Sequence, residues 1–311
     1  MMRILFMGTP DFALFSLRAL VEAGEDVIGV VTQPDKPKGR GYTLTPPPVK
    51  VYATERGLPV WQPPTLRGEE FAQLLSEIDP ELIVVVAYGK ILPTNVLEYP
   101  KYGCVNVHGS LLPEYRGAAP MQRAIIDGKP ETGVTTMMMD VGLDTGDMLL
   151  SERLPIETND NFETVHDKLG ACGARVLLST VEAIKDGSVK RVPQNAALAT
   201  YAAKIEKSDC LIDFSRSARE VHNLVRGLSP IPLAFTHTPD GKLLKVIETA
   251  LVEGDFDAPA GTVVSIAGGR VTVACAKGAI ALLAVLPEGK KRMPADAFIN
   301  GRGVGVGDLL A

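Results

Sequence analysis

Short apolar runs, which are typical of buried strands, alternate with segments of helical periodicity through the first part of the chain. A strand is predicted at residues 3–7, and the turn Gly8-Thr9-Pro10-Asp11 leads into a helix at 12–23 and a second strand at 27–32. This order is typical of a βαβ unit, so we expect a parallel sheet with right-handed crossovers. Further strands are expected at 58–62, 82–87, 104–107 and 132–139, and further helices at 49–55, 69–78, 122–126 and 161–184.

The pattern changes after about residue 205. A helix is predicted at 215–227, and short strands separated by Gly-rich turns follow at 234–238, 243–253, 261–266, 270–274 and 280–287. Several short strands of this kind indicate a small β-barrel. We therefore predict an α/β protein with a Rossmann-like parallel-sheet domain at 1–189, a linker at 190–206, and a smaller OB-like β-barrel domain at 207–311.

Composition narrows the classes of function. The chain has 46% hydrophobic and 22% charged residues, without a long apolar run or signal-peptide core, so we expect a cytoplasmic protein, and we expect it to be a monomer. A formal net charge of −5 excludes a strongly basic nucleic-acid binder, so such contacts would have to come from local patches. The four cysteines form no CxxC pair, which favours buried free thiols over a disulfide framework or a zinc site.

The connection at residues 33–50 is rich in proline, has no periodicity, and carries Lys36, Lys38 and Arg40. A connection of this length is either a mobile functional loop or a disordered linker. Its basic tip can contact phosphate groups, although a solvated surface loop fits the same pattern.

The stretch NVHGSLLPEYRG at residues 106–117 carries the most distinctive chemistry. Asn106 and His108 are two apart, so both side chains leave the same face of an extended segment, and MDVGLDTGD downstream offers Asp140, Asp144 and Asp147. An amide and an imidazole can stabilise an oxyanion, and a carboxylate can orient the imidazole. Ser110 is not in a GxSxG motif, which favours direct acyl transfer over an acyl-enzyme. A structural histidine and a turn asparagine remain open alternatives.

The loop that begins Tyr88-Gly89 follows a predicted strand, at the position where open α/β sheets bind ligands. A nicotinamide site is disfavoured, because GTPDFA at residues 8–13 is not GxGxxG and the second strand ends in Thr32-Gln33 instead of an acidic residue.

Several motifs in order resemble the folate-dependent formyltransferases over the full chain. They are MRILFMGTPDFA, TQPDKPKGRG, AYGKILP, NVHGSLLPEYRGAAPMQRAI, MDVGLDTGD and KIEKSDCLIDFSRSA. The sequence departs from the family at Phe214, where tryptophan is more usual, and this difference concerns packing more than chemistry.

The resemblance implies transfer of the formyl group of 10-formyltetrahydrofolate, as cosubstrate and without a metal, to the α-amine of charged initiator methionyl-tRNA. It implies that Asn106, His108 and Asp144 are catalytic. The segment that it implies for folate binding, together with the ligand loop described above, comprises Ser110, Leu111, Leu112, Pro113, Tyr88 and Gly89. It also implies tRNA contacts from Lys36, Lys38, Arg40 and the second domain.

Three other functions are compatible with parts of the sequence. The same fold and formyl donor can serve a nucleotide, a nucleotide sugar or water as acceptor, but the second domain and the basic loop argue against a small acceptor. A non-enzymatic RNA-binding module would use the basic loop and Lys290-Lys291-Arg292 on phosphates. A nicotinamide oxidoreductase is the remaining option at the level of the fold.

Overall fold

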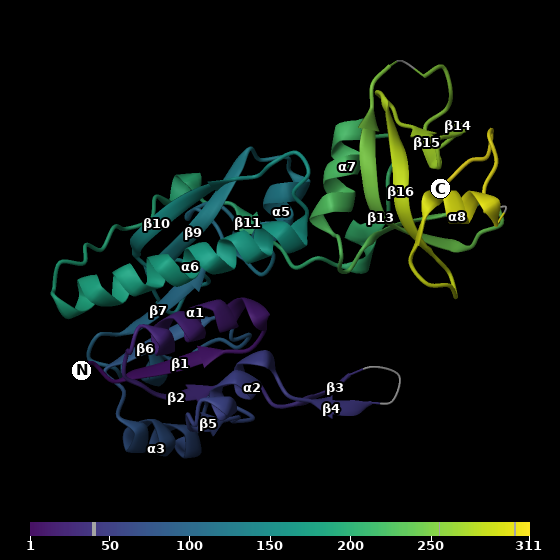
Figure 1. Ribbon diagram of the computed structural model, residues 1–311. Coiled ribbons are helices and arrows are strands. Elements are labelled where there is room, and N and C mark those ends of the chain that lie inside the picture. The colour runs from purple at the N-terminus through teal and green to yellow at the C-terminus, as the bar shows by residue number, and fades with distance from the viewer. Residues whose placement is uncertain (39–41, 255, 302) are drawn as a thin grey trace. The chain divides into compact units, whose positions relative to one another are not determined.

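A seven-stranded sheet forms the first of two units in the computed structural model (Figure 1). The structure describes residues 1–38, 42–254, 256–301 and 303–311. The first unit comprises residues 1–117, 132–154 and 166–202, and the second comprises 118–131, 155–165 and 203–311. Both units are therefore discontinuous in sequence, and the predicted boundaries at 189 and 207 remain a proposal.

The first sheet has the strand order β10-β9-β7-β6-β1-β2-β5. Its strands are β1 (Ile4–Gly8), β2 (Val27–Val31), β5 (Val60–Trp61), β6 (Leu82–Val86), β7 (Cys104–His108), β9 (Glu131–Met138) and β10 (Met148–Pro155). The pairs from β5 to β7 are parallel, which confirms the predicted parallel sheet, whereas β9 runs antiparallel to β7. The sequence analysis does not predict β10, because most of its residues are exposed or half-exposed at the sheet edge.

Helices α1 (Asp11–Glu22), α2 (Pro48–Glu55), α3 (Glu69–Ile78), α4 (Thr94–Leu97) and α6 (Phe162–Lys185) accompany this sheet. Helix α1 buries one apolar side, which includes Phe12, Leu17 and Leu20. Gly8 ends β1 where the chain turns into α1, and a Cβ atom there would lie 2.7 Å from the Ala13 Cβ. The close approach of strand and helix therefore requires glycine at this position.

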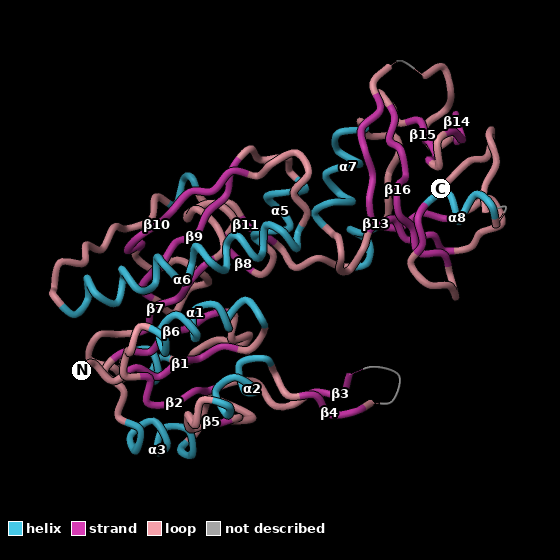
Figure 2. The backbone as a smooth tube through the Cα atoms, viewed as in Figure 1, coloured by secondary structure: helices cyan, strands magenta, loops and turns pink. Residues whose placement is uncertain are grey.

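The predicted loop at 33–50 contains a short antiparallel hairpin, made of β3 (Lys36–Lys38) and β4 (Thr43–Thr45). Figure 2 shows both strands projecting beyond α2. An ion pair closes the base of the hairpin, because Lys50 Nζ donates to both Asp35 carboxylate oxygens, at 2.9 and 2.8 Å, and to Gln62 Oε1 at 2.7 Å. Local polar pairing thus organises a segment whose sequence has no periodicity.

The second unit contains an antiparallel sheet in the order β12-β13-β16-β15-β14, with β17 paired to β16. This arrangement confirms the predicted smaller β domain. Its strands are β12 (Ala234–His237), β13 (Leu243–Val252), β14 (Val263–Ala267), β15 (Arg270–Ala274), β16 (Ala279–Pro287) and β17 (Met293–Pro294), and its helices are α5 (Pro120–Ile126), α7 (Ala218–Gly227) and α8 (Ala295–Asn300).

Apolar side chains from α7 and the strands form the core of this second unit. Val221, Leu244 and Leu282 are fully or almost fully buried there, and Ser217 begins α7 with a capping box shared with Glu220. Phe214 lies in the same core and is only 5% exposed.

Two further strands end segments of the first unit, directly before the chain passes into the second. Strand β8 (Arg116–Gly117) pairs in parallel with β11 (Tyr201–Ala202), which follows the short helix η1 (Ala196–Leu198). A second short helix, η2 (Lys207–Cys210), lies in the second unit. All four cysteines are buried and free, as predicted. Within the described residues, no helix has both the length and the apolar character needed to cross a membrane.

Candidate active site

Strand β7 carries both polar side chains singled out in the sequence. Asn106 and His108 are separated by one residue, and their backbones pair with β9 at Met137 and Thr135. Residues at this spacing on a strand share a face of the sheet. The strand thus ends with an amide and an imidazole on one side, as expected.

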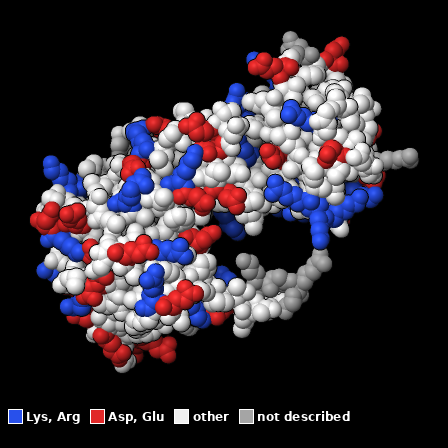
Figure 3. Space-filling view, in the orientation of Figure 1, with Lys and Arg blue, Asp and Glu red and all other residues white. Residues whose placement is uncertain are grey.

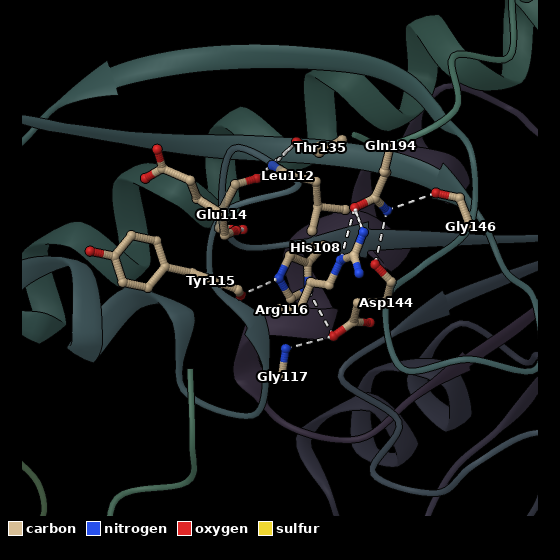
Figure 4. A network of polar contacts seen from close by, with 11 residues as sticks. His108, Leu112, Glu114, Tyr115, Arg116, Gly117, Thr135, Asp144, Gly146 and Gln194 are labelled. Carbon is tan, nitrogen blue, oxygen red and sulfur yellow. Dashed lines mark hydrogen bonds and ion pairs between the residues drawn. The ribbon is translucent and has the colours of Figure 1, made fainter. Parts of the chain in front are cut away.

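The His108 imidazole lies between a backbone carbonyl and a carboxylate (Figure 4). Its Nε2 atom is 2.9 Å from the Tyr115 carbonyl oxygen, and its Nδ1 atom is 3.8 Å from Asp144 Oδ2. A carbonyl oxygen can only accept, so Nε2 carries a hydrogen and donates it to Tyr115. The other ring nitrogen, Nδ1, is therefore the one that faces Asp144. Only 6% of His108 is exposed to solvent.

The Asp144 side chain is bonded by the segment that follows β7. Its Oδ2 accepts a hydrogen bond of 2.8 Å from the Gly117 N–H. Asp144 and Tyr115 both have left-handed backbone conformations, with φ of 52° and 59°. Residues other than glycine in this region store strain, and such positions gather at functional sites. Both of these strained residues make polar contacts with His108.

Gln194 and Arg116 brace these two segments. Arg116 donates to Gln194 Oε1 from Nε and from Nη2, at 3.0 and 2.7 Å, and Gln194 Nε2 donates to the carbonyl oxygens of Asp144 and Gly146. The sequence analysis assigned no role to Gln194, because it lies in a segment without periodicity and carries a common polar side chain. Nothing in the pattern could have found it.

The side-chain amide of Asn106 is half-buried and has no hydrogen-bond partner among the residues that the structure describes. Its two N–H donors are therefore available to a bound molecule. A partly buried donor of this kind suits a carbonyl oxygen on which negative charge develops.

The segment proposed for folate binding is a tightly bonded turn. Ser110 is fully buried, and its Oγ donates to the Glu114 carbonyl at 2.6 Å. Thr135 Oγ1 donates to the Ser110 carbonyl and accepts from the Leu112 N–H, at 2.8 and 3.1 Å. Leu112 is buried, whereas Leu111 and Pro113 are half-exposed. Ser110 thus supports the turn, and the half-exposed neighbours are the residues that it presents.

The loop after β6 presents backbone more than side chains. The Tyr88 ring is only 2% exposed and packs in a hydrophobic cluster with Leu5 and Met7, and this burial raises the pKa of Tyr88 to about 12. Its carbonyl accepts from Thr9 Oγ1 at 3.0 Å. Gly89 is exposed with φ of 87°, which glycine tolerates.

Two of the basic residues proposed for tRNA binding, Lys36 and Lys38, lie on strand β3 of the hairpin. Lys36 is exposed, Lys38 ends β3, and Arg40 lies outside the described residues. In the second unit, Lys290, Lys291 and Arg292 are exposed, and Figure 3 shows Lys and Arg side chains gathered along one edge of that unit. Local basic groups therefore occur on an acidic protein.

A thiol nucleophile does not fit this site. Cys104, which leads into β7, is 1% exposed, and burial raises the pKa of its thiol to about 12. A thiol with so high a pKa supplies very little thiolate at neutral pH. Within the described ranges, no three His, Cys, Asp or Glu side chains are grouped so that they could hold a metal ion.

The arrangement can therefore bind an oxyanion through an amide and move a proton through an imidazole that faces a carboxylate. These are the components of direct acyl transfer.

Family models match both parts of the chain. A model described as formyl transferase matches residues 2–181, and a model described as formyl transferase, C-terminal domain, matches residues 204–303. The segment at 182–203, which contains Gln194 and β11, lies between the two matches.

Similar sequences extend over almost the whole chain. A methionyl-tRNA formyltransferase of Desulforamulus reducens is 48% identical over 310 residues, which covers 99% of this chain and 98% of that protein. A methionyl-tRNA formyltransferase of Symbiobacterium thermophilum is 50% identical over 309 residues, with 99% and 94% covered.

Solved structures share the fold at low identity. An N-formyltransferase from Helicobacter canadensis, in complex with folinic acid and dTDP-3-aminofucose, has a TM-score of 0.67 at 20% identity and covers 91% of this chain and 99% of its own. HypX from Aquifex aeolicus, in complex with tetrahydrofolic acid, has a TM-score of 0.66 at 18% identity, with 98% and 48% covered.

Proposed function

Because this chain belongs to the formyl transferase family, we propose that it transfers the formyl group of 10-formyltetrahydrofolate to the α-amine of methionyl-initiator-tRNA. The product is N-formylmethionyl-tRNA, which serves translation initiation. The observation that carries this conclusion is the 48 to 50% sequence identity to methionyl-tRNA formyltransferases over almost the full length of the chain. The enzyme acts as a monomer in the cytoplasm, where its charged tRNA substrate is made.

The reaction needs a hydrogen-bond donor that stabilises the oxyanion, and a route by which one proton moves from the amine to the folate nitrogen. The uncharged α-amine bonds to the formyl carbon, the carbonyl oxygen becomes an oxyanion, and the bond from that carbon to the folate nitrogen then breaks. The proton lost by the amine ends on the folate nitrogen, so the transfer is balanced without an oxidant or reductant. Free α-amines have pKa values of about 7.7 to 8.0, so most of the amine is protonated near neutral pH and its ammonium proton must be removed before attack.

The side chains of β7 supply these requirements. The Asn106 amide, which has no hydrogen-bond partner in the described part of the chain, donates to the developing oxyanion, and it needs no reorganisation because it is already half-buried at the strand end. His108 presents Nδ1, with its other nitrogen occupied by Tyr115, so the proton moves at Nδ1. The Asp144 carboxylate, whose Oδ2 lies 3.8 Å from Nδ1, orients the ring.

Residues around this site bind the two substrates, the folate and the charged tRNA. Leu111 and Pro113 contact the folate from the turn after β7, and the backbone at Tyr88 and Gly89 lines the loop after β6. Ser110 and Leu112 act by holding the turn in shape, since both are buried. Lys36, Lys38 and Arg40 contact the phosphates of the tRNA acceptor end, and the second unit binds tRNA through its exposed basic edge.

The decisive experiment offers the enzyme three amines with the same formyl donor: charged initiator tRNA, charged elongator methionyl-tRNA and free methionine. We expect rapid formylation of the initiator species alone. Formylation of a small amine at a rate that added tRNA does not change would contradict the proposal. Purified protein that binds RNA but leaves all three amines unmodified would instead support a binding module.

Removing the charge of Lys36 is expected to weaken tRNA binding without changing the chemical step. For Lys36→Ala we expect a higher KM for charged tRNA, an unchanged kcat, and a plot of log affinity against log salt that is shallower by about one phosphate contact. Lys101→Ala is the matched control, because Lys101 is exposed but precedes the opposite end of β7. Equal salt slopes for the two variants would remove Lys36 from the tRNA interface.

A further inference from the structure

The side chain of Gln194 uses its whole amide to join the two segments that meet at His108. Its Nε2 donates to the Asp144 carbonyl at 2.9 Å and to the Gly146 carbonyl at 2.7 Å. Its Oε1 accepts both hydrogen bonds from Arg116. Because a guanidinium only donates and a carbonyl only accepts, the amide has a single favourable orientation. One half-buried side chain thus fixes a loop through its backbone.

The loop that carries Asp144 has few other supports. Val141, Gly142, Leu143 and Thr145 are all exposed. Among the described residues, the Asp140 carboxylate bonds within the loop, where it accepts from the Gly142 N–H and the Thr145 hydroxyl. Asp144 itself has the strained φ described above. A strained residue in an exposed loop keeps its conformation only when neighbouring contacts over-determine it, and Gln194 supplies two of those contacts.

The segment that supports the Asp144 loop also contacts the His108 imidazole. Three consecutive residues serve the site: the Tyr115 carbonyl accepts from His108, the Arg116 guanidinium holds Gln194, and the Gly117 N–H donates to the Asp144 carboxylate. Figure 4 shows these groups converging around the His108 ring. This short segment therefore bonds the Asp144 carboxylate directly, and it supports the Asp144 backbone through Gln194.

We propose that Gln194 is a positioning residue that sets the Asp144 loop so that the carboxylate lies at His108 Nδ1 during formyl transfer. Gln194 acts through Asp144 and does not contact either substrate. This inference rests on the proposed function, because Asp144 orients His108 only for that reaction.

The sharpest test is Gln194→Glu, which keeps the shape and the acceptor for Arg116. The substitution replaces the Nε2 donor by an oxygen that repels the carbonyls of Asp144 and Gly146. We expect kcat to fall about tenfold, since small displacements of catalytic groups lower rates by one to two orders of magnitude. The KM values for folate and tRNA should change little. Gln73→Glu on exposed α3 is the matched control and should leave kcat unchanged.

A double-mutant cycle separates positioning from general stability. In an Asp144→Asn background, Gln194→Glu should lower kcat by less than about twofold, because residues that act through one group are not additive. If the two losses multiply, or if Gln194→Glu alone keeps the wild-type kcat, the inference is overturned. Gln194→Asn, which keeps the amide but shortens its reach, repeats the test should the glutamate variant not fold.

Hydrogen–deuterium exchange of the full-length protein gives an answer that does not depend on activity. Peptides that cover residues 138–148 should exchange faster in Gln194→Glu than in the wild type and in Gln73→Glu, because the loop loses two hydrogen bonds. Unchanged exchange would overturn the inference. If the wild-type protein shows no formyl transfer to any of the three amines, the proposed function is overturned. The exchange result would still decide whether Gln194 holds the Asp144 loop.

Discussion

Alanine at Asn106 is expected to lower kcat by about 10²- to 10³-fold, which is the usual cost of losing one oxyanion donor. The side-chain amide has no hydrogen-bond partner among the described residues, so its removal breaks no hydrogen bond among them. The loss should therefore appear in the transition state. The KM for charged tRNA should stay near the wild-type value, because an oxyanion exists only after attack.

Two variants test whether this effect arises from the donor. Asn106→Asp keeps the shape of the side chain but presents a carboxylate that repels an oxyanion, so it should be at least as slow as Asn106→Ala. Asn95→Ala, at an exposed position of α4, should retain full activity. Steady-state kinetics with saturating folate and tRNA measures all three. An Asn106→Ala enzyme with near wild-type turnover would remove Asn106 from the chemistry.

Loss of the imidazole should have an effect of similar or larger size. For His108→Ala we expect kcat to fall by about 10²- to 10⁴-fold, the range typical of a residue that transfers protons. The substitution leaves a small cavity at the end of β7, next to Asp144 and the Tyr115 carbonyl. Added imidazole can occupy such a cavity, so part of the lost rate should return in its presence.

The rescue distinguishes proton transfer from structural support. His237→Ala is the matched control, because His237 lies on β12 of the second unit and contacts the chain terminus at Ala311. It should keep the wild-type kcat and show no response to imidazole. Activity of His108→Ala within about threefold of the wild type would exclude a proton-transfer role. Thermal unfolding of each variant reports whether the fold is retained.

The sequence predicts those parts of the site that lie on regular elements. Strand β7 has a continuous apolar pattern interrupted at Asn106 and His108, and the rules for parallel sheets place its end among the ligand loops. The Gly-rich turn after an apolar strand offers three carboxylates, and the resemblance to the formyltransferases selects Asp144 among them. Periodicity and strand order are local or nearly local properties, so one sequence is enough to reveal them.

The remaining parts depend on contacts that no local pattern encodes. Gln194 meets Asp144 across 50 positions in sequence, and only the folded chain brings them together. Strand β10 lies at a sheet edge, where exposure on both sides removes the alternation that marks a strand. The polar anchor at Lys50 likewise joins residues whose types are common in any surface loop.

The parallel pairing of β8 with β11 has a consequence for how such proteins can be recombined. Residues up to Ala202 complete the site that Arg116 and Gly117 begin, although they come directly before the second unit in sequence. A junction for exchanging C-terminal modules between relatives, in evolution or in protein engineering, should therefore fall after Ala202. A crossover at residue 190 would import a foreign partner strand and a foreign residue at position 194, so chimeras would inherit mismatched catalytic centres.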